Sequence, residues 1–177
     1  DLLLIDAFTG TELASQSLTS TSSILINGPA DQDDTLSIDF SNPFWLEGGI
    51  EYHGGDGGFD VMNFEVNDSV SLAYSALWTD SATILIQDGS LSMSLSFTGL
   101  EPVTIDGLIN LEFATTYPFQ TSGNPGVDVI TIDSPAAGEN RISGTSGGVA
   151  FETVTFLNVT NVIIDTGSND SIGDQDD

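Results

Sequence analysis

Two similar stretches of sequence decide the fold. The first reads Ser23-Ile-Leu-Ile-Asn27, Gly28-Pro-Ala-Asp-Gln-Asp-Asp34, Thr35-Leu-Ser-Ile-Asp39, and the second reads Gly49-Ile-Glu-Tyr-His53, Gly54-Gly-Asp-Gly-Gly-Phe-Asp60, Val61-Met-Asn-Phe64. In each, a short strand pattern meets a loop of glycine and aspartate, and a second strand pattern follows. The 26 residues from Ile24 to Ile50 suit one coil of a β-solenoid.

Strand alternation continues along the chain, and helical periodicity is nearly absent. We expect strands over residues 2–6, 23–27, 35–40, 49–53, 61–66, 82–87, 91–97, 103–105, 108–114, 127–132, 151–156 and 161–165. Asp88-Gly89 between two alternating runs predicts an antiparallel hairpin. The sequence therefore predicts one all-β unit over residues 1–177, with about eleven strands or more. We expect a parallel β-helix-like solenoid with an antiparallel hairpin insert; the alternative is a jelly-roll β-sandwich.

The charge of the chain is strongly one-sided. It has 27 acidic residues and one basic residue, Arg141, which gives a formal net charge of -26. Such a chain repels itself, and bound divalent cations or a salty medium are the two means of offsetting that repulsion. Nucleic acid and anionic membranes are poor partners for this surface. No apolar run is long enough to cross a bilayer, so we expect no membrane insertion.

The glycine and aspartate loops carry the clearest chemical signal. Glycine allows a tight turn with accessible carbonyl groups, aspartate supplies a hard oxygen ligand, and calcium takes six to eight such oxygens. Four loops of this kind in so acidic a chain favour calcium over ordinary β-turns, and none follows the EF-hand pattern. The adjacent acids near residues 33 and 176 support this, because neighbouring carboxylates repel unless a cation bridges them. The candidate ligands are Asp31, Asp33, Asp34, Asp56, Asp60, Asp128, Asp170, Asp174, Asp176 and Asp177.

Catalysis has few candidate residues. His53 is the single histidine, and the chain has no cysteine and no lysine. A role for His53 in a turn or beside a metal is therefore favoured over a catalytic triad, and Arg141 is expected to pair with a carboxylate. Several aromatic residues could line a sugar-binding face, although core packing is favoured for them: Phe44, Trp45, Tyr52, Tyr74, Trp78, Tyr117 and Phe119. We expect no enzyme activity.

The last and first residues of the chain, read in that order, resemble an internal stretch of the sequence. Placed end to start, Gly173-Asp-Gln-Asp-Asp177 and Asp1-Leu-Leu-Leu-Ile5 resemble the internal stretch Ala30-Asp-Gln-Asp-Asp-Thr-Leu-Ser-Ile38. Chance similarity in an aspartate-rich chain is the simple alternative. We expect one copy of a tandem or head-to-tail array, in which residues 1–22 form an N-terminal strand and a Ser/Thr-rich connector. The expected assembly contacts are Leu2, Leu3, Leu4 and Ile5.

The loops and their order resemble a repeat family of giant secreted bacterial proteins with haemolysin-type (RTX-like) calcium motifs. Further matching pieces are Phe97-Thr-Gly-Leu-Glu-Pro-Val103 and Asn140-Arg-Ile-Ser-Gly144 followed by Phe151-Glu-Thr-Val-Thr-Phe156. The loops depart from the family because they are scattered and degenerate. The resemblance implies a secreted, calcium-supported β-structure on the cell surface, with a structural or adhesive role.

Three classes of function stay open at this stage. The first is an extracellular structural or adhesive subunit that contacts copies of itself in a filament. The second is a carbohydrate-binding module or polysaccharide-acting β-helix protein, with glycans as partners. The third is an ice-binding solenoid, for which Thr-x-Thr at Thr153-Val-Thr155 is weak support.

Overall fold

A computed structural model describes residues 1–66, 69–107, 110–115 and 128–165. Within these ranges the protein is all-β, with a single turn of 3₁₀-helix, η1 (Leu18–Ser20). The expected all-β class is confirmed. No helix in the described ranges is long and apolar enough to cross a membrane.

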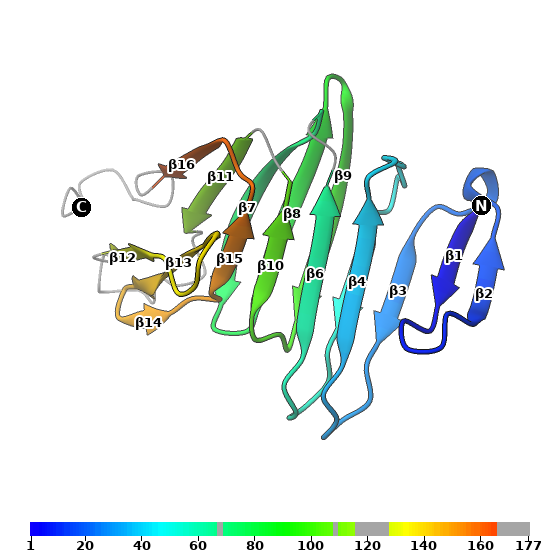
Figure 1. Ribbon diagram of the computed structural model, residues 1–177, viewed down its shortest axis with the longest axis horizontal. Helices are drawn as coiled ribbons and strands as arrows, with labels where there is room; N and C mark the ends of the chain where they lie inside the picture. The colour runs from blue at the N-terminus through cyan, green and yellow to red at the C-terminus, as the bar shows by residue number, and fades with distance from the viewer. Residues whose placement is uncertain (67–68, 108–109, 116–127, 166–177) are drawn as a thin grey trace.

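Two seven-stranded sheets form the body of the molecule (Figure 1). The first sheet consists of β3 (Ile24–Asn27), β5 (Ile50–His53), β7 (Ser71–Trp78), β8 (Ser81–Asp88), β9 (Leu91–Thr98), β11 (Asn110–Thr115) and β16 (Asn161–Asp165). The second sheet consists of β4 (Thr35–Phe40), β6 (Val61–Val66), β10 (Val103–Asp106), β12 (Asp128–Asp133), β13 (Glu139–Ser146), β14 (Val149–Ala150) and β15 (Val154–Leu157). Their orders are β16-β11-β7-β8-β9-β5-β3 and β12-β13-β15-β10-β6-β4, with β14 beside β13.

The chain passes back and forth between the two sheets, and successive passes pair in parallel. In the first sheet Ile24 of β3 pairs with Ile50 of β5. In the second sheet Thr35 of β4 pairs with Val61 of β6, again 26 residues further on. The expected parallel pairing of residues 23–27 with residues 49–53 is therefore confirmed. The two passes stay in register because the loops that join the sheets, residues 28–34 and 54–60, have the same length.

Antiparallel strands interrupt this pattern in two places. β7, β8 and β9 are joined as antiparallel neighbours, and Gly89 at the turn of the β8–β9 hairpin has a φ of 59°. The predicted hairpin at Asp88-Gly89 is therefore confirmed. β12 and β13 form a second antiparallel pair, and β13 then pairs antiparallel with β15.

The core lies between the two sheets and follows the strand alternation. On β8 the buried apolar side chains are Ala82, Ile84 and Ile86, while Leu85 between them is partly exposed. Tyr74 stacks on Phe113 with ring centroids 5.6 Å apart and an interplanar angle of 13°. Burial is complete at the middle strands and incomplete at both ends, where Ile24, Ile26, Leu36, Ile38, Ile130, Val162 and Ile164 are only partly buried.

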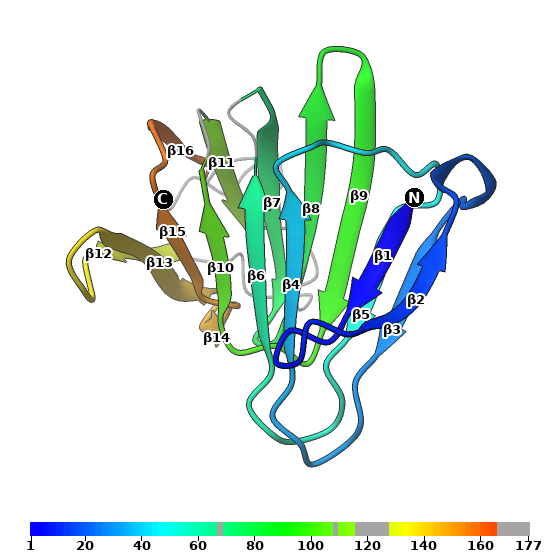
Figure 2. The ribbon, with the colours of Figure 1, turned by 45° about the vertical axis from the view of Figure 1, so that its right-hand side comes forward.

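The N-terminal segment differs from the expectation. β1 (Leu2–Ile5) pairs antiparallel with β2 (Glu12–Gln16), so the expected strand and connector form a hairpin with its own small sheet. Figure 2 shows this hairpin at the N-terminal end of the molecule. In its two strands every residue is exposed except Leu2, which is partly buried. The sequence also did not predict β7 or β13, and β15 begins at Val154 rather than at residue 151.

Candidate cation site in the glycine and aspartate loops

The loops over residues 28–34 and 54–60 stack on each other, because they join strands that are parallel neighbours. The Gly28 N–H donates to the His53 carbonyl at 2.7 Å, and the Asp31 N–H donates to the Asp56 carbonyl at 2.9 Å. The Val61 N–H donates to the Asp34 carbonyl at 2.9 Å. Main-chain bonds thus continue from the strands through both loops, and they hold equivalent residues side by side.

Two glycines make this stacking possible. A Cβ atom on Gly28 would lie 2.1 Å from the Gly54 carbonyl oxygen, and one on Gly54 would lie 2.1 Å from the Gly99 carbonyl oxygen. Real side chains do not tolerate such distances. Glycine is therefore required at both positions by the close approach of the neighbouring backbone.

Two aspartate side chains turn inward beneath these glycines. Asp60 is 2% exposed, and its Oδ1 accepts a hydrogen bond from the Asp34 N–H at 2.9 Å. The Oδ2 atom of Asp34 is buried and has no hydrogen-bond partner among the described residues. Burial and then the charges of Asp60 and Asp34 raise the pKa of the Tyr52 hydroxyl. Both carboxylates therefore lie near the edge of the core.

The two carboxylates lie beside backbone carbonyl groups, and both are hard oxygen donors of the kind that calcium takes. The Gly54 carbonyl and Asp34 Oδ2 both lie against the Cβ position of Gly28, and the Gly99 carbonyl and Asp60 Oδ2 lie in the same way against Gly54. A cavity of about 330 Å³ beside the loops is lined by Gly28, Ala30, His53, Gly55, Asp56 and Thr98, and neither of the two carboxylates lines it. No three acidic or histidine side chains of the described part of the chain lie close enough to hold one ion. Carbonyl groups and water would therefore have to supply the other oxygens.

The remaining predicted ligands lie in different surroundings. Asp31 and Asp56 are exposed in the two loops, and Asp33 accepts a hydrogen bond from the Phe59 N–H at 2.9 Å. Asp128 begins β12, at the opposite edge of the second sheet from β4, so it does not join the loops. Asp170, Asp174, Asp176 and Asp177 lie outside the described residues.

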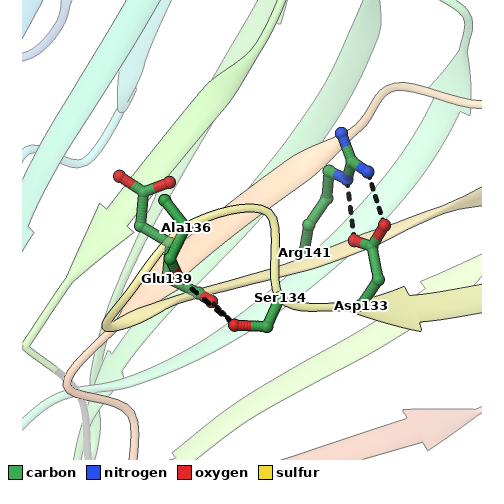
Figure 3. A network of polar contacts seen from close by, with 5 residues as sticks. All are labelled: Asp133, Ser134, Ala136, Glu139 and Arg141. Carbon is green, nitrogen blue, oxygen red and sulfur yellow. Dashed lines mark hydrogen bonds and ion pairs between the residues drawn. The ribbon is translucent and has the colours of Figure 1, made fainter.

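The basic side chains of the chain are engaged elsewhere. Figure 3 shows Arg141 forming two hydrogen bonds with the Asp133 carboxylate, which confirms its expected pairing with an acid. These bonds, and secondarily the charge of Arg141, lower the pKa of Asp133. His53 contacts Thr98 through Nδ1 at 2.8 Å and lies 3.0 Å from Glu51 through Nε2. Neither side chain is paired with Asp34 or Asp60.

The structure reveals one acidic residue that the sequence analysis missed. Glu152 lies between β14 and β15 and is 2% exposed. Its burial, and then the charges of Glu101 and Asp80, raise the pKa of its carboxyl group to about 9. Nothing in the local sequence marks it, because it lies outside the glycine and aspartate pattern.

The aromatic residues mostly serve the core. Tyr52 and Tyr74 are buried, and Phe44 and Trp45 are partly buried against Phe40. Of the proposed sugar-binding set, Trp78 alone is a strongly exposed ring among the described residues, at 45%. Tyr117 and Phe119 lie outside those residues.

Comparison with known proteins gives no relatives: no protein-family model, no curated protein and no solved structure matches this chain.

We predict that Gly54→Ala destabilises the protein by about 3 kcal/mol or more, because its Cβ would overlap a backbone oxygen that cannot move aside. The control is Gly138→Ala, where no atom lies within 4 Å of the added Cβ and only the left-handed backbone opposes the change, at about 1 kcal/mol. Urea unfolding measures both variants. Equal losses of stability would show that the loops do not stack closely.

We predict that Glu152→Gln stabilises the protein in chelator at pH 8 and changes little at pH 4. The folded-state pKa is raised from 4.5 to about 9, so the folded chain binds more protons than the unfolded chain between these values. Stability of the unsubstituted protein must then fall as pH rises through this window, and a neutral glutamine removes that loss. Thermal unfolding from pH 4 to pH 9 tests this; parallel pH curves for the two proteins would contradict it.

Proposed function

We propose that this chain is a secreted, calcium-stabilised structural or adhesive subunit of a bacterial surface fibre or filament, without catalytic activity. The observation that carries the proposal is the stacked pair of loops. They place the buried, unpartnered Oδ2 atom of Asp34 beside carbonyl oxygens, in a chain with a net charge of -26.

The architecture that best accounts for the sheets is a short solenoid with hairpin inserts. β4, β6, β10 and β15 are consecutive parallel neighbours, as are β3, β5 and β9. A jelly roll is built from antiparallel Greek keys, which supply no such ladders. The parallel ladders therefore favour the solenoid over the sandwich.

Calcium is the ion that these loops favour. The available ligands are carboxylates, carbonyl groups and water, which are hard oxygen donors. Two carboxylates per ion give weak sites, with dissociation constants of roughly 10⁻⁴–10⁻³ M as in extracellular modules. Such sites are filled outside the cell, which agrees with the secreted location that the family resemblance implies.

The strand directions support head-to-tail association. β8 is antiparallel to both β7 and β9, so β7 runs in the same direction as β9. The remaining neighbours in the first sheet pair in parallel, so its two edge strands, β3 and β16, also run in the same direction. The same reasoning gives β4 and β12 one direction in the second sheet. A second copy related by translation could therefore continue both sheets.

Both ends of the molecule also carry exposed apolar side chains, which a neighbouring copy could bury. Leu3, Leu4 and Ile5 of the N-terminal hairpin are each about half exposed, at 56%, 47% and 48%. At the other end Val129, Ile132 and Ile163 are exposed to a similar degree. An isolated two-stranded hairpin is marginally stable in water, so docking on another copy would stabilise it. Calcium would reduce the repulsion between two such acidic chains.

We predict that calcium raises the thermal midpoint through the stacked loops. At about ten times a millimolar dissociation constant the gain is about 1.4 kcal/mol, or roughly 3–6 °C. The variants Asp34→Asn and Asp60→Asn should each lose most of that gain. Asp88→Asn, in the exposed β8–β9 turn, should keep it. An identical midpoint in calcium and in chelator would contradict the proposed role of calcium.

We predict that removal of residues 1–6 yields monomers under conditions in which the intact protein assembles with calcium. Leu4→Ser should weaken assembly for the same reason, because it removes apolar surface from β1. Leu91→Ser is the control, since Leu91 is 49% exposed at the distant β8–β9 hairpin. Sedimentation velocity measures the size of each species. Fibres formed by the truncated chain, or an intact chain that stays monomeric at high concentration with calcium, would contradict head-to-tail assembly.

A further inference from the structure

A second cavity opens at the end of the fold where β6, β10 and β15 begin and β7 ends. Its volume is about 380 Å³, within the range of roughly 300–1,000 Å³ that small-molecule pockets occupy. The lining comes from four separate segments of the chain: Phe59, Thr79, residues 101–102 and residues 150–153. None of the residues considered above as cation ligands lines it, so it is a different site.

Main-chain hydrogen bonds hold the four lining segments together. Three bonds from an N–H group to a carbonyl join them: Glu101 to Asp60 at 2.7 Å, Glu152 to Trp78 at 2.9 Å and Leu100 to Asp80 at 3.2 Å. Each bond links a lining residue, or its direct neighbour in the chain, to another of the four segments. The cavity is therefore formed before a ligand enters it, which reduces the entropy lost on binding.

Two aromatic side chains belong to the lining of this cavity. Phe59 is 55% exposed, and its backbone is held in place because its N–H donates to the Asp33 carboxylate at 2.9 Å. Phe151 is buried and packs on Phe113, with ring centroids 5.3 Å apart. A ligand with an apolar face would remove the exposed ring of Phe59 from water, and this burial favours binding.

Polar side chains supply the rest of the lining. Glu152 is 2% exposed, and its burial, followed by the charges of Glu101 and Asp80, raises the pKa of its carboxyl group to about 9. At neutral pH this group is therefore a carboxylic acid, which can both donate and accept a hydrogen bond. Glu101 is exposed and accepts hydrogen bonds, and Thr79 and Thr153 also line the cavity and carry hydroxyl groups.

The chemistry of this lining narrows the class of ligand. The chain has no lysine, its one arginine is paired with Asp133, and no residue of the cavity lining is basic, so acidic ligands find no partner there. A purely apolar ligand would bury the carboxyl groups of Glu101 and Glu152 without hydrogen bonds, which is costly. A sugar ring has an apolar face of C–H groups and hydroxyl groups around its edge, and so matches both parts of the lining.

We propose that this cavity binds a neutral sugar unit of a glycan, with the apolar face of the sugar on Phe59 and its hydroxyl groups on Glu101 and Glu152. The site gives the adhesive role a partner and in that respect rests on the proposed function, whereas its location rests on the cavity. None of the described aromatic residues expected to line a sugar-binding face lies in it. For a single sugar we expect a dissociation constant on the order of 1 mM.

Saturation-transfer difference NMR on the intact chain tests the site, with N-acetylglucosamine, methyl glucoside and methyl galactoside as neutral probes. At least one of them should bind, and glucuronate, which carries a carboxylate, should not. Phe59→Ala should weaken binding by roughly tenfold because the apolar contact is lost, and Glu101→Gln should weaken it by roughly tenfold because a charged acceptor is lost. Both side chains are exposed, so neither change disturbs the core. Phe8→Ala, at a ring that is 99% exposed outside the cavity, is the matched control and should retain full affinity.

Three results would overturn the inference: no binding of any neutral probe, unchanged affinity in Phe59→Ala, or tighter binding of glucosamine than of N-acetylglucosamine, which would indicate a site for an ammonium group. Calcium separates this inference from the proposed function. If calcium stabilises and assembles the chain but no probe binds, the inference fails and the calcium-stabilised structural role stands. If a neutral probe binds through Phe59 while calcium leaves the thermal midpoint unchanged, the sugar site stands and the role of calcium fails.

Discussion

The structure depends on parallel main-chain pairing that continues without a break from the strands into the loops. Where the chain crosses between the sheets, the Gly28 and Gly54 N–H groups bond to the carbonyls of His53 and Thr98. The backbones then approach so closely that any side chain at these glycines would overlap an oxygen. Because the register is held this tightly, whatever residue type recurs at one position forms a continuous row across neighbouring strands. Apolar rows build the core in this way.

Local patterns in the sequence predicted the features that are encoded locally. The alternation in β3 and β5 and their spacing of 26 residues predicted this pair of parallel neighbours, and Asp88-Gly89 predicted the hairpin. β13 could not be found in this way because Ile142 is its single large apolar residue, and its stability comes from pairing with β12 and β15. β2 was missed for a similar reason, since its residues are exposed on every side and show no buried face.

The acidic residues of interest likewise include some that local sequence patterns predict and some that they do not. Asp34 and Asp60 were predictable because the glycines around them mark a turn that brings oxygen atoms together. Glu152 was not, since its burial depends on the pairing of β15 with β10, whose partner residues lie 51 residues apart in the chain (154 − 103). Periodicity within a strand contains no information on which distant strand lies beside it. A buried acid far from any glycine therefore looks, in the sequence alone, like an ordinary surface residue.

The two antiparallel departures, β8 with β9 and β12 with β13, have a consequence for how such a fold can change over time. Each adds a pair of strands, and two reversals of direction restore the original one, so every later strand enters its sheet with the orientation it would have had without the addition. A single added strand would instead turn the rest of the chain the wrong way. Variation in this architecture is thus constrained by parity: a hairpin can be gained or lost between two passes of the chain, whereas a lone strand cannot, and the edge strands of each sheet keep one common direction through such changes.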